Sequence, residues 1–373
     1  MVEGKSGAVR RPRVALVSAN AYPVMGGVET HVWEVAPRVA AAGFDVTILT
    51  TDRSGRLARR EVLNGTPARR VGAWPKGRDW YFAPGVYREV IRGGFDLVHC
   101  QGYHTLVPPM AMLAALSARV PYVLTFHSGG HGSALRNRLR GPQRAALRPL
   151  LAHARRLVAV SEFEARFFSN ELSLPASRFS TIYNGAAMAW PETGDTSNDN
   201  APLILSVGRL ERYKGHHRLI AALPFVLARC PGARLRIVGA GPYEAELRRL
   251  AAASPAAERI EIGSIDPADR GAMARALASA SVVTLLSEYE ANPVSVMEAL
   301  SLHRRVLVAD TSGLSELAHR GWARAIPISS TDEQVAQAIL KLLATPAPTN
   351  FELPTWDACA AQLVQVYREV LGN

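Results

Sequence analysis

Short apolar runs alternate with longer stretches of helical period along almost the whole chain, and this alternation limits the possible folds more than any other feature. Runs rich in Val, Ile and Leu that are followed by amphipathic segments are typical of parallel β-α units. In the first half, the pattern predicts strands at Val14–Ser18, Val46–Thr50, Leu97–Cys100, Tyr122–Phe126 and Leu157–Val160. It predicts helices at Val28–Ala42, Leu106–Ala118, Gln143–His153 and Glu162–Glu171. The first half is therefore expected to form an open α/β sheet.

The alternation stops at Ala187–Pro202, where Pro, Gly, Asp, Ser and Asn cluster, and then begins again. The second series predicts strands at Leu203–Val207, Arg234–Val238, Ile260–Gly263, Val282–Leu286 and Arg305–Ala309. Its helices are expected at Lys214–Arg229, Tyr243–Ala253, Asp266–Ala278, Pro293–Leu302, Glu333–Leu343 and Thr355–Leu371. A length of 373 residues fits two domains better than one.

We therefore predict two Rossmann-like, doubly wound α/β domains that face an interdomain cleft. The predicted units are a flexible leader over 1–12, a first domain over 13–190, a linker over 191–202, a second domain over 203–350 and a C-terminal helix over 351–373. A return of that last helix to the first domain is one option. Ligands of open α/β sheets bind outside the carboxyl ends of the strands, so the ligand site is expected between the domains.

Positive charge is concentrated in the first half. The formal net charge is +11, and residues 1–190 contain 25 Lys and Arg against 12 Asp and Glu, whereas residues 191–373 contain 18 against 20. No acidic residue interrupts the stretch 134–156, which includes Arg136, Arg138, Arg140, Arg144 and Arg148. Such a run fits a solvated helix face, or a surface for anionic lipid or a phosphorylated acceptor. Nucleic acid is not expected as a partner, because no stacking aromatics interleave the arginines.

Cysteine use and hydropathy predict a reducing, aqueous environment. Cys100, Cys230 and Cys359 are odd in number and far apart, which favours neither a disulfide framework nor a zinc site. The longest apolar stretches, such as Leu106–Leu116, are too short or too interrupted by proline to span a bilayer. We expect a cytoplasmic protein, with peripheral attachment to the inner face of the membrane as an option that depends on the arginine run.

The glycine pattern argues against a nicotinamide-dependent dehydrogenase. The fingerprint G-x-G-x-x-G should follow the first strand of a domain, but only the pair Gly26-Gly27 occurs there. The later sequence Gly239-Ala240-Gly241 has no third glycine in register. Gly26 and Gly27 stand before a helix, where small residues and free N–H groups suit a phosphate. A simple turn is the alternative for this pair.

Two cations mark the start of the second domain. Arg209 ends the first predicted strand and Lys214 precedes the next helix, so both are expected at the cleft. An enzyme without a metal needs such groups to neutralise a diphosphate leaving group. The sequence has no Asp-x-Asp pair, so a metal-chelating site of that kind is not expected. The alternative is that both cations are simply exposed basic residues.

Seven residues separate Glu290 from Glu298. Asn292 can cap a helix and Pro293 can occupy its first position, which places Glu290 before the helix and Glu298 within it. Glu298 would lie about 7.5 Å along the axis from Pro293, at ~1.5 Å per residue. This spacing suits carboxylates that hold opposite ends of an extended nucleotide sugar better than a glycosidase pair. A surface position for Glu298 is less expected, because apolar residues surround it in sequence.

His127 ends a predicted strand and is followed by the small residues Ser128-Gly129-Gly130. A histidine at the end of a strand in an open α/β sheet points towards the ligand crevice more often than a random one. A hydrogen-bonded structural histidine is the alternative.

The chain resembles the retaining glycosyltransferases of family four, which have the GT-B fold. The resemblance extends from Arg13 to about Leu343 and uses separate motifs in the same order. These are Gly26-Gly27-Val28-Glu29, Phe126-His127, Ser161-Glu162-Phe163, Asn184-Gly185, Gly208-Arg209-Leu210, Lys214-Gly215, Gly239-Ala240-Gly241-Pro242 and the segment from Glu290 to Glu298.

The resemblance implies transfer of a hexose from a UDP- or GDP-hexose donor, with no cofactor and no metal. It implies catalytic roles for His127, Arg209, Lys214 and Glu290, and ribose binding by Glu298. The donor site would also include Gly26, Gly27, Gly208, Gly239, Asn292, Pro293 and Val294. The family's front-face displacement requires no protein nucleophile.

The resemblance is not complete. Ala291 replaces the more usual glycine after the first glutamate, and Thr311-Ser312-Gly313 stands where paired glycines are common. These departures leave the transferred sugar open. The acceptor is also open between a lipid-linked or polysaccharide acceptor of the cell envelope and a soluble natural product or polyol. A catalytically silent nucleotide-sugar-binding protein is the remaining alternative.

Overall fold

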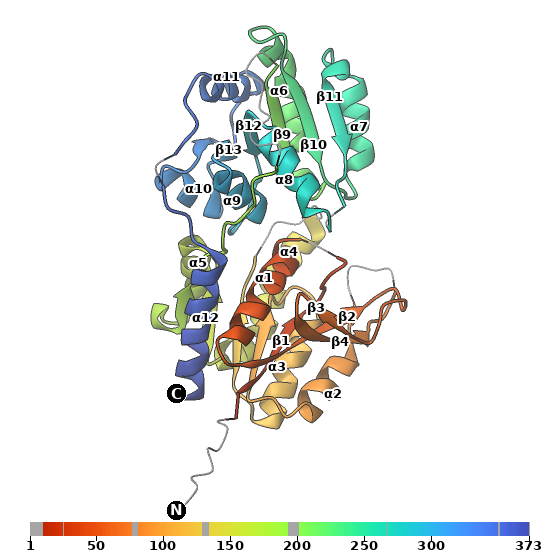
Figure 1. The fold of residues 1–373 in the computed structure, drawn as a ribbon, viewed down its shortest axis with the longest axis vertical. Helices are drawn as coiled ribbons and strands as arrows, with labels where there is room; N and C mark the ends of the chain where they lie inside the picture. The colour runs from red at the N-terminus through yellow and green to blue at the C-terminus, as the bar shows by residue number, and fades with distance from the viewer. Residues whose placement is uncertain are drawn as a thin grey trace, which may run out of the picture.

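The computed structural model describes residues 10–24, 26–76, 81–128, 134–192, 201–266, 268–349 and 351–372, with the side chains of 134–139 left out. Two α/β domains lie one above the other (Figure 1). Residues 1–9 of the predicted leader and residues 193–200 of the predicted linker lie outside the described residues. Within the described residues, no helix has the length and apolar character needed to cross a membrane.

The first domain contains a sheet of eight strands in the order β3-β4-β2-β1-β5-β6-β7-β8. The strands are β1 (Arg13–Ser18), β2 (Asp45–Asp52), β3 (Arg60–Leu63), β4 (Thr66–Gly72), β5 (Leu97–Gln101), β6 (Tyr122–Thr125), β7 (Arg156–Ala159) and β8 (Phe179–Thr181). All neighbours are parallel except β3 and β4. Asn64 and Gly65 connect that antiparallel pair with φ of 46° and 75°, as a tight hairpin turn requires.

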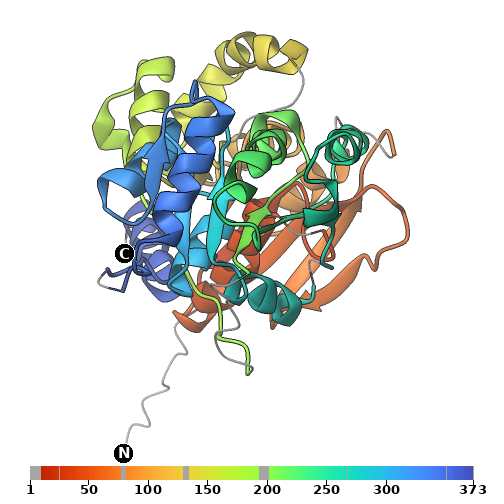
Figure 2. The same ribbon diagram turned by 90° about the horizontal axis from the view of Figure 1, so that it is seen from above.

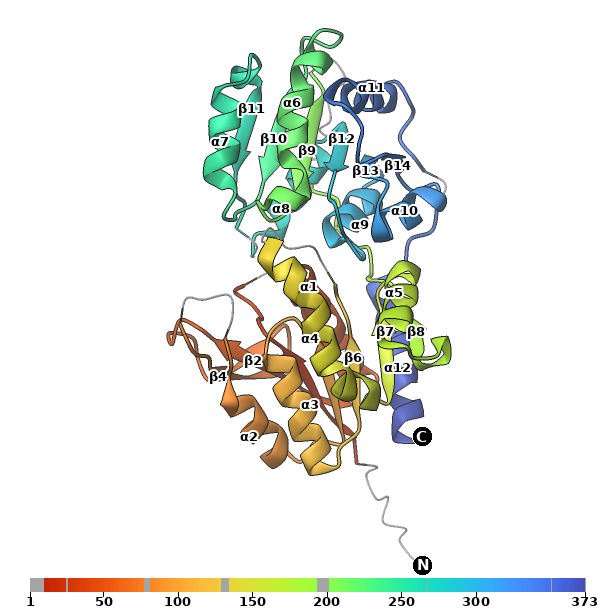
Figure 3. The ribbon, with the colours of Figure 1, turned by 180° about the vertical axis from the view of Figure 1, so that it is seen from behind.

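Helices cover both faces of this sheet. They are α1 (Gly27–Ala41), α2 (Pro84–Arg92), α3 (Val107–Ala118), α4 (Ala134–His153) and α5 (Glu162–Leu172), with a short 3-10 helix η1 (Ala176–Arg178). One core contains Val86 of α2, Met112 of α3 and Phe168 of α5, whereas Val32 of α1 belongs to a core on the other face. Figure 3 accordingly shows α2, α3 and α4 together on the face turned to the viewer.

The second domain contains a parallel sheet of six strands in the order β11-β10-β9-β12-β13-β14. The strands are β9 (Leu203–Val207), β10 (Arg234–Val238), β11 (Ile260–Gly263), β12 (Val282–Leu285), β13 (Arg305–Ala309) and β14 (Arg324–Ile326). Its helices are η2 (Arg212–Lys214), α6 (His216–Leu227), α7 (Glu244–Ala252), η3 (Ala257–Arg259), α8 (Arg270–Ala278), α9 (Val294–Ser301), α10 (Ser312–His319) and α11 (Asp332–Leu343). Seen from above, this domain covers much of the first, and α4 lies at the rim of the molecule (Figure 2).

The last helix, α12 (Trp356–Leu371), returns to the first domain. Leu363 and Tyr367 share a buried core with Val32 and Val35 of α1. Just before α12, the chain runs beside the segment that leaves the first domain, because the N–H of Ala186 donates to the carbonyl of Pro354 at 2.7 Å. The return of the helix is thus the option that the structure adopts.

The prediction of two doubly wound parallel sheets is confirmed, although several short elements were missed. The sequence analysis passed over the β3–β4 hairpin, α2, β8, α10 and β14, and it began α4 nine residues too late. It was also wrong about the start of α9. Pro293 is the residue before the helix rather than its first residue, and Asn292 does not cap it, because no side-chain cap is formed there.

Candidate active site

The candidate residues of the second domain meet where its strand order reverses. In that sheet β9 lies between β10 and β12. The chain first adds β10 and β11 on one side of β9, and it then adds β12, β13 and β14 on the other side. The loop after β9 carries Arg209 and Lys214, and the loop after β12 carries Glu290. In the first sheet, β1 and β5 form the corresponding switch point, and Gly26 follows β1. Such switch points are the usual ligand positions of open α/β sheets.

Lys214 and Glu290 form a buried ion pair. The Lys214 Nζ donates to Glu290 Oε1, and the same oxygen accepts a hydrogen bond from the Ser287 hydroxyl at 2.8 Å. Their side chains are only 13% and 9% exposed. Burial lowers the pKa of Lys214, but the charge and hydrogen bond of Glu290 together with Tyr213 outweigh this effect, so the pKa is raised. The lysine therefore stays charged.

Arg209 is the more accessible cation. Its side chain is 62% exposed and lies 3.0 Å from the carboxylate of buried Glu211. The carbonyl of Arg209 is 3.2 Å from Nε2 of His216, whose Nδ1 is 2.9 Å from the Ser206 hydroxyl. These contacts hold the backbone at the end of β9 while leaving the guanidinium exposed to an incoming ligand.

Gly26 and Gly27 lie at the N-terminus of α1, across from the second domain. A Cβ on Gly27 would lie 3.8 Å from Val294, whereas one on Gly26 would lie 2.8 Å from the carboxylate of Glu29. Glu29 thus folds over the start of its own helix, where free N–H groups attract anions. Burial raises the pKa of Glu29, although hydrogen bonds and the charge of Arg209 oppose this rise. This carboxylate marks the position of an anion site.

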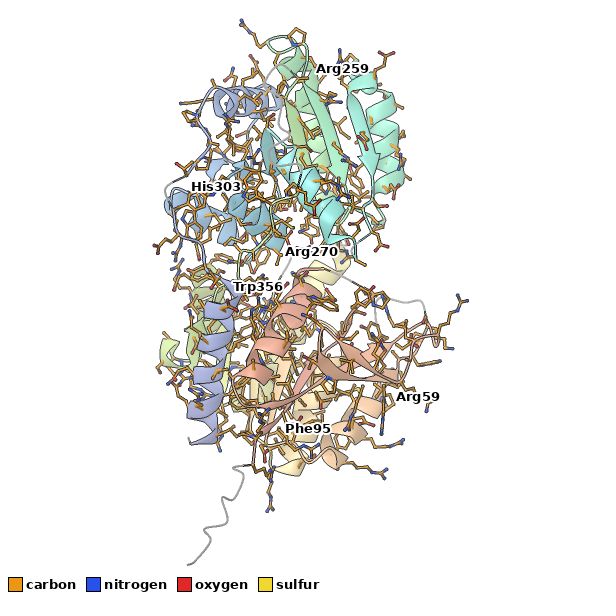
Figure 4. The ribbon with its side chains drawn as sticks, viewed as in Figure 1. Arg59, Phe95, Arg259, Arg270, His303 and Trp356 are labelled. Atoms are coloured by element: carbon orange, nitrogen blue, oxygen red, sulfur yellow. The ribbon has the colours of Figure 1, made fainter. Side chains whose placement is uncertain are left out.

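Glu298 is paired with a residue that sequence analysis did not select. Its side chain is 7% exposed, and Oε1 accepts a hydrogen bond from Arg270 at 2.5 Å. Figure 4 shows Arg270 at the edge of the second domain that is turned towards the first. Burial raises the pKa of Glu298, while Arg270 lowers it. The predicted apolar surroundings of Glu298 are confirmed, because Val296, Met297 and Leu300 are buried.

Asn292 is a buried polar residue with unused hydrogen-bonding capacity. Its carbonyl accepts a hydrogen bond from Asn184 Nδ2 at 3.2 Å, while its own Oδ1 is buried and has no hydrogen-bond partner. A buried amide oxygen without a partner is costly unless a ligand satisfies it. The neighbouring Pro293 and Val294 lead into α9, and Val294 faces Gly27.

Gly239 has a clear packing role beside Gly208. A Cβ on Gly239 would lie 1.9 Å from the carbonyl of Gly208, so no larger residue fits between the ends of β9 and β10. The N–H of Gly208 donates to Val238 at 3.0 Å, which continues the pairing of the two strands. Gly239 thus allows the loop with Arg209 to lie close to its neighbour, whereas a Cβ on Gly208 would come no closer than 3.9 Å to another side chain.

On the first-domain side, His127 belongs to a group of neutral histidines. Its backbone has a φ of 47°, and Nε2 is 2.7 Å from Gln101 Oε1. Its ring meets that of His31 edge to face at 4.7 Å. Burial lowers the pKa of His31 to about 4 and that of His99 to about 3. Burial and these neighbours also lower the pKa of His127 well below its ordinary value.

A chain of hydrogen bonds joins the two sides of the site. The Ser128 hydroxyl lies 2.9 Å from the Tyr289 hydroxyl, and it also donates to Glu164 Oε1 at 2.5 Å. Glu164 accepts further bonds from the N–H groups of Ser128 at 2.6 Å and Val160 at 2.8 Å. Burial raises the pKa of Glu164 to about 7. Because Ser128 follows His127 and Tyr289 precedes Glu290, this chain fixes the two candidate residues relative to each other.

Two arginines of the run, Arg144 and Arg148, have defined contacts. Arg144 pairs with Glu171 of α5 at 2.5 Å and lies over the Phe167 ring, while Arg148 donates to the carbonyl of Leu172 at 2.8 Å. Arg140 is half-buried. The side chains of Arg136 and Arg138 lie outside the described residues. Arg144 and Arg148 therefore contribute to packing between α4 and α5.

The cysteines and acidic residues form no further site in the parts that the structure describes. All three cysteines are free, and Cys100 and Cys359 are buried. Among the described residues, no group of three or more His, Cys, Asp or Glu side chains could hold a metal ion.

Sequence analysis missed Arg270, Ser128, Tyr289 and Glu164. Only Glu164 had a usable signal, since Ser161 and Glu164 have the spacing of a capping box and the Ser161 hydroxyl accepts from the Glu164 N–H at 3.1 Å. Ser128 and Tyr289 are neighbours of selected residues, but nothing in the sequence shows that they meet.

Two family profiles cover most of the chain. Glycosyltransferase Family 4 matches residues 25–189, and Glycosyl transferases group 1 matches residues 194–353. The phosphatidyl-myo-inositol mannosyltransferase of Mycolicibacterium smegmatis is 27% identical, over 96% of this chain and 94% of that protein. The GDP-mannose:cellobiosyl-diphosphopolyprenol alpha-mannosyltransferase of Xanthomonas oryzae pv. oryzae is 26% identical, over 96% of this chain and 97% of that protein.

Solved structures show the same fold. Sucrose-phosphate synthase from Thermosynechococcus elongatus matches with a TM-score of 0.79 at 21% identity, over 97% of this chain and all 100% of that one. HepE of Anabaena, solved with UDP and glucose, matches with a TM-score of 0.69 at 18% identity, over 96% of this chain and 99% of that one.

Proposed function

Because this chain belongs to the family 4 glycosyltransferases and has their GT-B fold, we propose that it transfers a hexose, with retention and without a metal, from a UDP- or GDP-hexose to a hydroxyl of a cell-envelope acceptor. The observation that supports this most is the Lys214–Glu290 pair at the switch point of the second domain, together with the N-terminus of α1 at the switch point of the first domain, where Gly27 faces Val294. This junction combines a buried, charged lysine, a carboxylate and a helix N-terminus that the side chain of Glu29 now covers.

The charges of this junction suit a nucleoside diphosphate. Lys214 and the exposed Arg209 offer positive charge to the departing diphosphate, and the N–H groups at the start of α1 offer hydrogen bonds once Glu29 moves aside. These groups supply the charge neutralisation that a bound cation provides in other enzymes. Glu298 and the unpartnered Asn292 Oδ1 are acceptors for hydroxyl groups of the donor.

The arrangement also suits front-face displacement. Glu290 Oε1 already accepts hydrogen bonds from Lys214 and Ser287, so this carboxylate is held as an electrostatic group and is a poor nucleophile. The bond from the sugar to the diphosphate breaks, the acceptor oxygen bonds to the same face, and the leaving phosphate takes the acceptor proton. We therefore assign no protein nucleophile.

An acceptor with a phosphate group fits the named relatives. One acts on phosphatidyl-myo-inositol and another on a diphosphopolyprenol, as their names state. The excess of positive charge in the first domain supports such an acceptor for this chain as well. A soluble natural product has no comparable support.

Product stereochemistry and metal dependence test the proposal directly. Purified protein is incubated with UDP- and GDP-hexoses and a phosphorylated acceptor, and the anomeric signal of the product is followed by NMR. We expect the donor configuration to be kept and the rate to be unchanged by EDTA. Inversion would refute retention, and loss of activity in EDTA that Mg²⁺ or Mn²⁺ restores would refute metal independence.

A further inference from the structure

The outer face of α3 is unusually apolar. The helix contains no charged residue, and along one stripe Leu106 is 50%, Leu113 47% and Leu116 38% exposed. Residues seven and ten positions apart lie on the same face of a helix, so these leucines form one row. A surface helix ordinarily turns polar residues to water. The first domain leaves this row of leucines exposed, so only a partner surface can cover it.

The neighbouring helix α2 extends the apolar face. Tyr87 is 40% and Ile91 41% exposed, and they are one helical turn apart. The Tyr87 hydroxyl donates to the Ser117 hydroxyl of α3 at 3.0 Å, which fixes the two helices side by side. Figure 3 shows α2 and α3 on the same side of the first domain. We call the surface of Tyr87, Ile91, Leu106, Leu113 and Leu116 the α2–α3 face.

The charges around the α2–α3 face are positive. Arg88 and Arg92 of α2 are exposed, and exposed Arg119 directly follows α3. The acidic residue of α2, Glu89, is neutralised by Arg69 at 3.0 Å. An apolar centre with an arginine rim is the combination that binds an anionic bilayer, since apolar side chains enter the acyl boundary while arginines meet lipid phosphates.

We propose that the α2–α3 face docks the first domain on an anionic membrane surface. Charge complementarity distinguishes this partner from a second copy of the chain, because two copies would bring their arginine rims together. The inference rests on the proposed function only in that it explains how the enzyme reaches a lipid-linked acceptor. Docking itself requires neither donor nor transfer.

Vesicle flotation tests the proposal with the full-length protein. Vesicles of phosphatidylcholine with about 30% phosphatidylglycerol, which have a negative surface potential, are compared with pure phosphatidylcholine. We expect anionic vesicles to bind the protein at least about tenfold better, and we expect Leu113→Gln with Leu116→Gln to weaken that binding about tenfold. Arg88→Gln with Arg92→Gln should weaken it by a similar factor.

The second domain offers a matched control. Phe225 and Ile328 are 47% and 42% exposed there, so Phe225→Gln with Ile328→Gln replaces two apolar side chains of similar fractional exposure elsewhere. The control should float like the unchanged protein. Equal flotation of the Leu113/Leu116 variant and the unchanged protein would overturn the proposal. So would a dimer in light scattering that this variant converts to a monomer without a change in flotation.

Donor hydrolysis without vesicles separates this inference from the proposed function. The Leu113/Leu116 variant should hydrolyse donor at the same rate as the unchanged protein and have the same melting temperature. Loss of flotation with hydrolysis intact supports docking. If neither the unchanged protein nor any variant hydrolyses donor, this would count against the proposed function. The flotation result would still test docking by itself.

Discussion

The two sides of the interdomain site contain different kinds of polar group. On the second-domain side, Lys214 and Glu290 are charged groups that neutralise each other, and Glu298 is held by Arg270. On the first-domain side, His31 and His127 are kept neutral by burial. A diphosphate needs countercharge, whereas a sugar needs only hydrogen bonds. The second domain thus holds the paired charged groups of the site, and the first domain holds histidines that are neutral hydrogen-bonding groups.

The largest expected effect comes from removing charge on the second-domain side. Lys214→Ala should lower turnover by about 10²–10³-fold, because it deletes the buried cation and leaves Glu290 without a countercharge. Turnover at saturating donor measures this, with circular dichroism to verify folding. Lys341→Ala, at an exposed position of α11, is the control and should be unchanged. Equal turnover in the two variants would show that the ion pair is not needed.

The neutral state of the first-domain histidines can be tested by measuring stability at two pH values. An unfolded histidine has a pKa of about 6.5, and that of His31 in the folded protein is about 4. Between these values the unfolded state binds more protons, so the contribution of His31 to stability is complete above pH 6.5 and is lost as the pH falls towards 4. The loss amounts to up to about 3 kcal/mol.

Urea unfolding at pH 7 and pH 4.5 measures this difference. His31→Gln should lose clearly less stability over that interval than the unchanged protein, whereas His319→Gln, at an exposed position, should lose as much as the unchanged protein. A His31→Gln variant with the full loss would mean that burial of His31 does not oppose protonation.

His127 should act through a hydrogen bond and not through its charge. Nε2 donates to Gln101 Oε1 in the structure, so the neutral ring leaves Nδ1 as an acceptor. His127→Ala should lower turnover about tenfold, the scale of one buried hydrogen bond, and His127→Gln should restore part of it. The pH profile of turnover between pH 6 and 8 should also be the same in His127→Gln as in the unchanged protein. A loss of activity centred near pH 6.5 that disappears in His127→Gln would contradict neutrality.

The smallest effect is expected for the contact between the two sides. Tyr289→Phe should lower turnover about fivefold, because it removes a hydrogen bond of about 1 kcal/mol. Ser128→Ala also removes the hydrogen bond to Glu164 and should lower turnover at least as much. The double variant should be no worse than Ser128→Ala, because the bond between Ser128 and Tyr289 is lost in both. Tyr183→Phe is the control, since this hydroxyl also joins the domains, through Glu316 and Arg320. Additive losses in the double variant would show that Ser128 and Tyr289 act separately.

The main sheets could be predicted because their signal is local. The strands β9, β12 and β13 are mainly apolar runs, whereas β10 and β11 alternate apolar with charged residues. Both patterns are strand signals, and the order of the strands follows from their alternation with helices. The β3–β4 hairpin was missed although Asn64-Gly65 is a turn signal, because its strands carry arginines and a proline in place of an apolar run. A search for apolar runs therefore does not find polar strands at the edge of a sheet.

The only site residues whose proximity could be predicted are those that directly follow strands. Lys214 and Glu290 are 76 residues apart, yet both follow strands at the switch point, so their meeting follows from topology. The pairing of Glu298 with Arg270 depends on the orientation of α8, and that of Ser128 with Tyr289 on how the domains meet. Neither is encoded in the sequence near these residues.

The position of α12 affects how this protein is made and how it can be recombined. During synthesis, α1 emerges early, but its partners Leu363 and Tyr367 are translated only after the whole second domain. The first domain therefore completes its core at the end of translation, with an apolar face uncovered until then. For the same reason, a chimera that takes its first domain from another enzyme must also take the final helix of that enzyme, because the core of the first domain is built from two separate segments of the gene.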